Sequence, residues 1–317
     1  MKDLFGNQKD KNQLINLNLF CDEAESQGWL YLGILIIPVA RENEFIQDLL
    51  NCRCGNPAKN TIWGECVDIC RHHAKNNTHI HFKDIHKAKD KFFIAKKWIE
   101  YLLSDREIIH FYILGLDINK IDLSQFGERK QRSNIYNRFF RTAILKSVKS
   151  YFHKWDTIVI DNIYHDNNRS LETHKHFPWH PIFFISSNDE KITIKAKNVT
   201  FIDSDHRLSG SQYSHLIQFM DLVLGCVHNC LHHTSKDNDK EIIALQSLKL
   251  IQRIIDKPNN RNSQYNYVGR QKIEFFPKYD LRNLNESELE CENKRMGAFY
   301  TGRHIKIKDR NQITLFN

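Results

Sequence analysis

Residues 14–39 read LINLNLFCDEAESQGWLYLGILIIPV, and this stretch decides how the fold begins. From Leu17 to Asp22 the side chains alternate with a period of two, which is typical of a β-strand that ends in acidic residues. From Trp29 onward the stretch is nearly all apolar, as in a strand that is covered on both faces. The sequence therefore predicts a hairpin of two strands joined through residues 25–28.

The remainder of the chain mixes helical and strand patterns. Apolar residues at helical spacing predict helices over residues 41–51, 92–103, 134–152, 211–231 and 241–255. Apolar and β-branched runs predict strands over residues 106–118 and 156–164, one or two strands within 192–205, and two further candidates at 272–278 and 304–308. This order indicates an α/β protein with a mixed sheet covered by helices.

Length and composition narrow the class of protein. The 317 residues suffice for one elaborated domain or two modest ones, and 41% hydrophobic with 26% charged residues excludes collagen-like, disordered and low-complexity chains. Lys and Arg number 46 against 38 Asp and Glu, and this net charge of +8 suits a polyanionic partner.

The sequence also suggests where the protein resides. The N-terminal residues lack the apolar stretch of a secretory signal, and the longest apolar run, residues 29–40, is shorter than the roughly twenty residues of a membrane span. We therefore expect a cytoplasmic protein with no membrane partner. Its eight cysteines are then thiols or metal ligands in a reducing compartment.

Three aspartates are notable for their positions. Asp22 and Asp161 each close an apolar strand, and Asp221 lies on a narrow polar stripe of the otherwise apolar helix at 211–231. Sites collect at strand ends in open α/β sheets, so the three carboxylates converge if the strands are neighbours and the helix packs over them. The alternative is a solvated position for each strand end and, for Asp221, either an arginine partner or the capping of a loop.

Converging carboxylates can hold hard divalent ions, because Mg²⁺ prefers oxygen ligands and shares them with substrate phosphates. Two such ions activate a water and stabilise the leaving oxygen when a phosphodiester bond is cut. Glu23 follows Asp22 directly and points to the opposite face of the strand, so it is a weaker candidate.

Five short motifs occur in a distinctive order. They are FCDEA at 20–24, HFKDI at 81–85, VID at 159–161, DSD at 203–205 and LIQFMD at 216–221. Over about residues 15–230 this pattern resembles the bacterial domain-of-unknown-function family 3800, which is similar in fold to RNase H-like nucleases and transposases. A bacterial or antiphage-defence setting is typical of that resemblance.

The resemblance implies an RNase H-like mixed sheet and a phosphoryl-transfer site that uses Mg²⁺ or Mn²⁺. The chain departs from the family pattern in Asp-Glu-Ala-Glu-Ser at 22–26 and at His79, so His81, Asp84 and Glu23 all remain candidates for a fourth ligand. The implied catalytic residues are Asp22, Asp161, Asp221 and Glu23, of which the three aspartates are also the implied metal ligands. Gln218 and Ser204 are the implied substrate or supporting contacts.

Residues 51–88 are rich in Cys and His and are interpreted as an insertion. Cys52, Cys54, Cys66 and Cys70 provide enough soft ligands for one structural Zn²⁺, although neither pair has the usual CxxC spacing. Unmetallated thiols in a polar loop are the alternative. His81 and Lys83 are candidate substrate contacts with phosphate, against the alternative of a solvated loop.

Residues 127–155 combine positive charge with aromatic side chains. Arg138 and Arg141 are candidate phosphate contacts, and we expect Tyr136, Phe139 and Phe140 to be exposed, where they could stack on unpaired bases. A solvated helix flank is the simpler alternative. Together with a carboxylate metal site, the pattern favours RNA or DNA as the partner.

We expect an RNase H-like core at 15–233 that contains the insertion at 51–88, followed by a helical and basic C-terminal extension at 234–317. The extension would lengthen a nucleic-acid channel or contact a partner protein or a second copy. The leading hypothesis is a divalent-metal-dependent nuclease that hydrolyses phosphodiester bonds, as a defence or toxin effector. The alternatives are a non-catalytic nucleic-acid- or protein-binding scaffold of the same fold and a zinc enzyme built on the insertion.

Overall fold

The hairpin predicted from residues 14–39 is present and forms the middle of the sheet. β1 (Leu14–Ser26) and β2 (Trp29–Pro38) pair antiparallel, with Ser26 opposite Trp29. Gly28 lies in the turn with φ +82°, a backbone conformation that glycine adopts without the steric cost of a Cβ.

The structure, a computed structural model, describes residues 13–26, 28–54, 78–104, 107–121, 132–188, 190–232, 235–255 and 267–276. In these ranges seven strands form a mixed sheet of order β5-β4-β1-β2-β3-β7, with β6 also paired to β4. The other strands are β3 (His110–Asp117), β4 (Thr157–Asp166), β5 (Ile192–Ile194), β6 (Thr200–Ile202) and β7 (Gln271–Phe276).

Strand directions divide the sheet into two halves. β2 runs antiparallel to its two neighbours, β1 and β3, whereas β4 runs parallel to β1 and both β5 and β6 run parallel to β4. β7 adds to the other edge, parallel to β3. The α/β class and the mixed sheet expected from the sequence are therefore confirmed.

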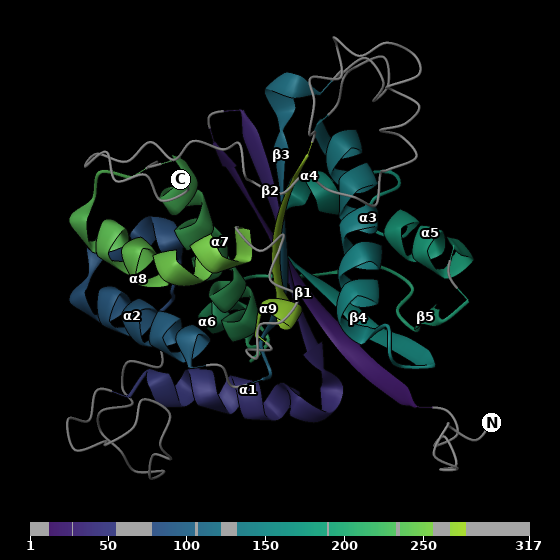
Figure 1. Ribbon diagram of the computed structural model, residues 1–317, viewed down its shortest axis with the longest axis horizontal. Coiled ribbons are helices and arrows are strands. Elements are labelled where there is room, and N and C mark those ends of the chain that lie inside the picture. The colour runs from purple at the N-terminus through teal and green to yellow at the C-terminus, as the bar shows by residue number, and fades with distance from the viewer. Residues whose placement is uncertain are drawn as a thin grey trace.

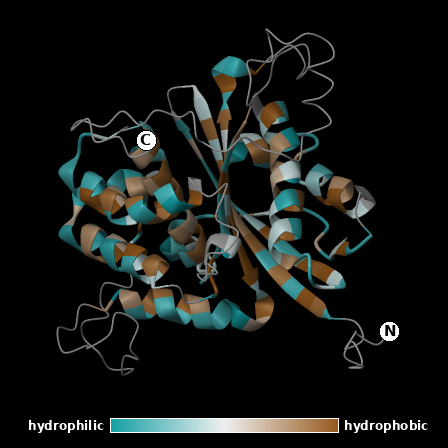
Figure 2. Cartoon of the chain, viewed as in Figure 1, coloured by the Kyte–Doolittle hydropathy of each residue, from teal (hydrophilic) through white to brown (hydrophobic). Residues whose placement is uncertain are grey.

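Helices cover both faces of the sheet, which Figure 1 shows nearly edge-on. The longer described helices fall into two groups, one on each side of the sheet, and Figure 2 shows that they mix hydrophobic and hydrophilic residues, as amphipathic helices do. The first group is α1 (Val39–Cys52), α2 (Lys89–Leu103), α7 (Ser214–His232) and α8 (Asn238–Ile255); the second is α3 (Arg132–Phe152) and α5 (His180–Asn188).

Several shorter helical segments were not predicted from the sequence. They are η2 (Phe82–Lys87), η3 (Ile118–Lys120), α4 (Arg169–Glu172), α6 (His206–Ser209) and α9 (Tyr267–Arg270). Each is too short to show an apolar period. Among the described helices, none is both long and apolar enough to cross a membrane.

Side chains of β1 alternate between two hydrophobic cores. Phe20 points into the core beneath α1, α2, α7 and α8, whereas Leu19 and Cys21 point into the core beneath α3 and α5. This is the period of two expected for a strand, and here both faces are covered. Asp22 therefore belongs to the α7 face and Glu23 to the α3 face.

Parts of the expected insertion and extension pack with the core. Ile80 and Ile85, at the end of the Cys/His-rich stretch, are fully buried against it. α8 packs on α7 and α2, and β7 continues the sheet beside β3. The candidate strand at 304–308 lies outside the described residues.

Gly225 of α7 provides the space in which Phe82 of η2 packs. A Cβ added at Gly225 would lie 2.2 Å from Phe82 Cγ, far closer than carbon atoms can approach. Helix propensity alone favours alanine over glycine by about 1 kcal/mol. The contact with Phe82 reverses that preference, because the ring and the backbone of η2 must shift.

We expect Gly225→Ala to lower the free energy of unfolding by about 1–3 kcal/mol, the usual range for overpacking a core. Gly269→Ala is the matched control, since nothing lies within 4 Å of its added Cβ. Urea unfolding followed by circular dichroism measures both variants. A neutral or stabilising Gly225→Ala would show that η2 does not pack on α7 as described.

Candidate functional site

Asp22 and Asp221 are brought together by the close approach of α7 to the sheet. Asp22 pairs with Gly33 of β2, and directly opposite residues on antiparallel strands share a face. A Cβ at Gly33 would lie 2.7 Å from Met220 Cε, so the missing side chain lets α7 approach at this point. Asp221 follows Met220 directly, and its carboxylate is thereby carried toward Asp22.

Asp166 supplies a third carboxylate at the end of β4. The last paired residues of the parallel strands β1 and β4 are Cys21 and His165, so Asp22 and Asp166 each stand one residue beyond them. Asp166 Oδ1 accepts hydrogen bonds from the backbone N–H groups of Asn167, at 2.9 Å, and Ser204, at 3.1 Å. These donors hold the carboxylate at the C-terminal edge of the sheet.

The three aspartates form an acidic cluster, a name used below for Asp22, Asp166 and Asp221. Asp22 is only 6% exposed, and its pKa is raised well above the ordinary value by burial and then by the charges of Asp221, Glu23 and Asp166. Burial also raises the pKa of Asp166. Like charges that repel in a poorly solvated place destabilise the ionised form, so the cluster favours a proton or a cation.

Asp161 does not join this cluster. The register of β1 and β4 shifts between Leu17 and Asn18, and Asp161 is the unmatched residue of the resulting bulge. Its Oδ1 lies 2.8 Å from Lys195 Nζ. Five residues along β4 separate it from Asp166, about 16 Å at 3.3 Å per residue. The expected convergence of Asp161 with Asp22 is therefore replaced by that of Asp166.

The sequence contained a signal for this difference. The sequence predicts a strand over residues 156–164, and Asp161, directly after the apolar run IVI at 158–160, marks its predicted end. The isoleucines that β4 contributes to the core beneath α3 are Ile158, Ile160 and then Ile163. The spacing changes from two residues to three between Ile160 and Ile163, as a bulge produces. The strand continues past the bulge to Asp166.

Segment 78–82 lines the acidic cluster. Asp221 Oδ2 accepts a hydrogen bond of 2.7 Å from Phe82 N and lies 3.1 Å from His81 Nδ1. His79 stands beside His81 with ring centroids 6.1 Å apart, and burial lowers its pKa. Two imidazoles are thus held at the edge of the carboxylates. Asp84, another candidate ligand, pairs instead with Lys87 and Lys91.

Gln218 holds three loops around the cluster. Its Oε1 accepts from Arg53 Nη2, at 2.9 Å, and from Ile80 N, at 3.0 Å; its Nε2 donates to Ser204 O, at 2.6 Å, and lies 3.1 Å from His206 Nδ1. The residue is fully buried. Gln218 therefore positions the walls of the site, and the expected contact of its amide with substrate is not what these hydrogen bonds support.

Arg53 is part of this arrangement and was not singled out from the sequence. Its guanidinium is fully buried, stacks over Trp98 at 4.8 Å and donates to Thr78 O. Burial lowers its pKa to about 9, and burial with the nearby Arg53 charge lowers that of His215 to about 2. A lone arginine beside a cysteine pair carries no pattern that could have revealed this role.

Glu23 lies on the other face of β1, as its position after Asp22 predicts. Its carboxylate lies 3.3 Å from His165 Nε2 and accepts a hydrogen bond from Asn168 Nδ2. Tyr136 of α3 also reaches His165, with its hydroxyl 2.6 Å from Nε2. Glu23 is thus engaged by protein groups, although its charge still raises the pKa of Asp22.

The basic and aromatic residues of α3 differ from expectation. Tyr136, Phe139 and Phe140 are buried in the core beneath α3, so the prediction that they are exposed for base stacking is wrong. Arg138 and Arg141 are half-buried on the same helix, on the face of the sheet opposite α7. Lys83 is exposed on η2.

The candidate zinc ligands are described only in part. Cys52 and Cys54 are fully buried at the end of α1. Cys66 and Cys70 lie outside the described residues. Over the described residues as a whole, no three His, Cys, Asp or Glu side chains stand close enough to hold a metal ion between them.

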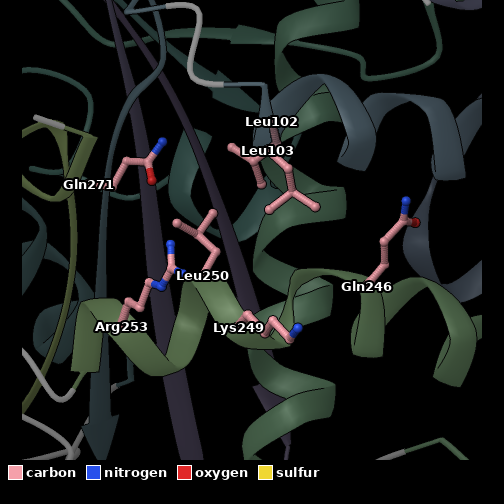
Figure 3. Close-up of a pocket in the computed structure, with 7 residues that line it drawn as sticks. All are labelled: Leu102, Leu103, Gln246, Lys249, Leu250, Arg253 and Gln271. Atoms are coloured by element: carbon pink, nitrogen blue, oxygen red, sulfur yellow. The ribbon is translucent and has the colours of Figure 1, made fainter. Parts of the chain in front are cut away.

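A separate pocket of about 240 Å³ lies between α2, α8 and the start of β7. Figure 3 shows its lining, in which Arg253 and Gln271 accompany the apolar side chains of Leu102, Leu103 and Leu250. None of its lining residues belongs to the acidic cluster. The chemistry of the cluster is therefore independent of this pocket.

Comparison with known proteins identified no relative: no family model, no curated protein and no solved structure matches this chain.

The raised pKa of Asp22 has a consequence for stability. A native pKa above the unfolded value of about 3.9 means that the native state binds more protons between these two values. Stability therefore falls as the pH rises through that window. We expect Asp22→Asn to be more stable than the unsubstituted chain at pH 7, by about 1 kcal/mol, and to lose that advantage near pH 3.

Denaturant unfolding at a series of pH values measures this effect. Asp117→Asn is the matched control, because Asp117 is equally buried, at 7% exposure, but lies 3.3 Å from Lys120 Nζ. That variant should be less stable than the unsubstituted chain at pH 7. An Asp22→Asn variant that is also less stable at pH 7 would contradict the repulsion described for the acidic cluster.

Proposed function

We propose that the chain is a divalent-metal-dependent nuclease that hydrolyses phosphodiester bonds of RNA or DNA, with Asp22, Asp166 and Asp221 as its metal ligands. The observation that carries the proposal is the acidic cluster itself. Three carboxylates from β1, β4 and α7 lie toward one edge of the sheet, and burial and then their mutual repulsion raise the pKa of Asp22. A divalent cation would relieve that repulsion.

The donor set fits Mg²⁺ or Mn²⁺. Carboxylate oxygens are the ligands these hard ions prefer. The thiol next to Asp22 along β1, that of Cys21, points into the core beneath α3, and burial raises its pKa. When bound, such ions supply an activated water and stabilise charge on the phosphate. The acidic cluster would hold them, with Asp221 oriented by Phe82 N.

His79 and His81 are the chain's own candidates for moving a proton. In the described part of the chain, His79 Nε2 is buried and has no hydrogen-bond partner, and His81 lies against Asp221. Burial lowers the pKa of His79, so its ring is neutral and able to accept a proton at pH 7. Gln218 fixes this segment through Ile80 N.

The topology supports an RNase H-like fold within this proposal. An antiparallel β3-β2-β1 half that continues into a parallel β4 and β5 half is the arrangement such a fold requires. The motifs that resemble family 3800 contribute Asp22 and Asp221 to the proposed site. The third motif, at 159–161, ends in Asp161, whereas the ligand proposed from β4 is Asp166, which lies beyond that motif.

A nuclease assay with single-stranded and duplex RNA and DNA tests the proposal. We expect cutting with Mn²⁺ or Mg²⁺ and none with EDTA. Asp22→Asn, Asp166→Asn and Asp221→Asn should each lower the rate about 100-fold or more, since a metal supplies several kcal/mol of transition-state stabilisation. Asp161→Asn is the matched control and should cut like the unsubstituted chain. Equal rates for Asp166→Asn and the unsubstituted chain would refute the ligand assignment.

A non-catalytic scaffold that binds nucleic acid or a protein is the second candidate, favoured by the absence of a close metal-ligand group among the described side chains. Metal binding separates the two. As a nuclease, the chain should gain about 2.7 kcal/mol of stability at a Mn²⁺ concentration 100 times the dissociation constant. Thermal unfolding should show that gain for the unsubstituted chain and not for Asp22→Asn, whereas a scaffold should show it for neither.

A further inference from the structure

Two large aromatic side chains are exposed on the face of the molecule opposite α7. Trp179 is 43% exposed just before α5, and Phe183, one helical turn later, is 64% exposed. Their ring centroids lie 6.3 Å apart. α5 lies beside α3 on the outside of the molecule (Figure 1). Exposed aromatic pairs of this kind mark binding surfaces more often than isolated apolar residues do.

The segment that carries these rings is anchored from below. Phe177 is fully buried, with ring centroids 5.1 Å from Phe140 and 5.5 Å from Tyr136. Trp179 Nε1 donates a 3.1 Å hydrogen bond to Lys175 O, so the indole is held by its polar edge. A ring that is fixed before binding loses little conformational freedom when a ligand stacks on it.

Positive charge adjoins the aromatic pair. The Arg141 guanidinium lies 4.1 Å over the ring of Phe184, and its Nη1 donates to His180 Nε2 at 3.2 Å. Burial and then the nearby Arg138 charge lower the pKa of Arg141, which places two guanidinium groups in each other's field. The described residues give Arg141 no carboxylate partner. The neighbouring guanidinium groups of Arg138 and Arg141 suit the binding of a phosphate.

The aromatic pair and the acidic cluster flank the same strand end. The ring centroids of Phe177 and His165 lie 5.9 Å apart. His165 Nε2 lies 3.3 Å from the carboxylate of Glu23, the residue after Asp22. Val199 N also donates to Pro178 O, which ties the segment to the start of β6 next to β4. The segment that carries the two rings is therefore tied to the end of β4 that bears Asp166.

We propose that Trp179 and Phe183, with Arg141 and Arg138, form a stacking platform for single-stranded nucleic acid. This deepens and rests on the proposed nuclease function, because it names the substrate as unpaired RNA or DNA. Bases within a duplex are already stacked on one another, whereas unpaired bases can stack on exposed rings while the cations contact the backbone. A protein partner would not require the two guanidinium groups beside the rings.

Fluorescence anisotropy of a labelled single-stranded oligonucleotide tests the platform. The measurement is made in EDTA, where no cutting is expected, so binding is read separately from catalysis. The double variant Trp179→Ala with Phe183→Ala should bind single strands between about 10- and 100-fold more weakly. Its weak binding to a duplex of the same length should not change. The single variant Trp179→Phe, which keeps an aromatic ring, should retain most of the single-strand affinity of the unsubstituted chain.

The matched control removes two apolar side chains of similar exposure from α8. Ile242 and Leu245 are 40% and 52% exposed and lie away from the platform. Ile242→Ala with Leu245→Ala should bind single strands like the unsubstituted chain. Arg141→Gln should reduce the slope of log affinity against log salt by about 0.7, the value for one phosphate contact on a single strand.

Two results would overturn the platform. One is unchanged single-strand binding in the double variant, and the other is an equal loss for single strands and duplex. The proposed function can fail separately: if metal gives no cutting of any substrate but the double variant loses single-strand binding, the platform stands and the nuclease does not. Cutting that persists with unchanged single-strand affinity in the double variant supports the nuclease and refutes the platform.

Discussion

The packing of α7 on the sheet at Gly33 is the contact on which the rest of the site depends. Met220 occupies the space that a Cβ of Gly33 would need, and Leu224 packs beside it. Because Gly33 pairs with Asp22, the same close approach that completes the core also brings Asp221 toward Asp22. Hydrophobic packing thus overcomes the repulsion between two carboxylates that would separate in water.

The surrounding polar groups are fixed by a second buried constraint, the carboxamide of Gln218. Its oxygen accepts from Arg53 and Ile80 N, and its nitrogen donates to Ser204 O. A buried polar group that lacks a partner is costly, so the segments of Arg53, Ile80 and Ser204 are held in one fixed arrangement around α7. Ser204 N in turn donates to Asp166, and Ile80 precedes the histidines beside Asp221. Gln218, which is fully buried, therefore positions Asp166 and the two histidines of the site.

Charge is distributed unevenly between the two faces of the sheet. The acidic cluster lies on the α7 face, whereas Arg138, Arg141 and the exposed rings of Trp179 and Phe183 lie on the α3 face. The two groups meet across the end of β4, where Asp166 faces one side and His165 the other. The net charge of +8 conceals this separation. In the proposed function, the acidic side would carry the chemistry and the basic, aromatic side would hold the strand.

The sequence by itself determined the elements whose patterns are local: the hairpin of β1 and β2, the α/β class, the long helices and the buried strand β4. It also marked Asp22, because a strand end is visible in a period of two. Tertiary structure alone decided which residues meet. The bulge in β4 removed Asp161 and substituted Asp166, since one extra residue shifts every later side chain. Packing of α3 on the sheet buried Tyr136, Phe139 and Phe140, whereas Trp179 and Phe183, at α5, stay exposed. Which aromatic side chains of a helix face the core depends on neighbours that are distant in sequence.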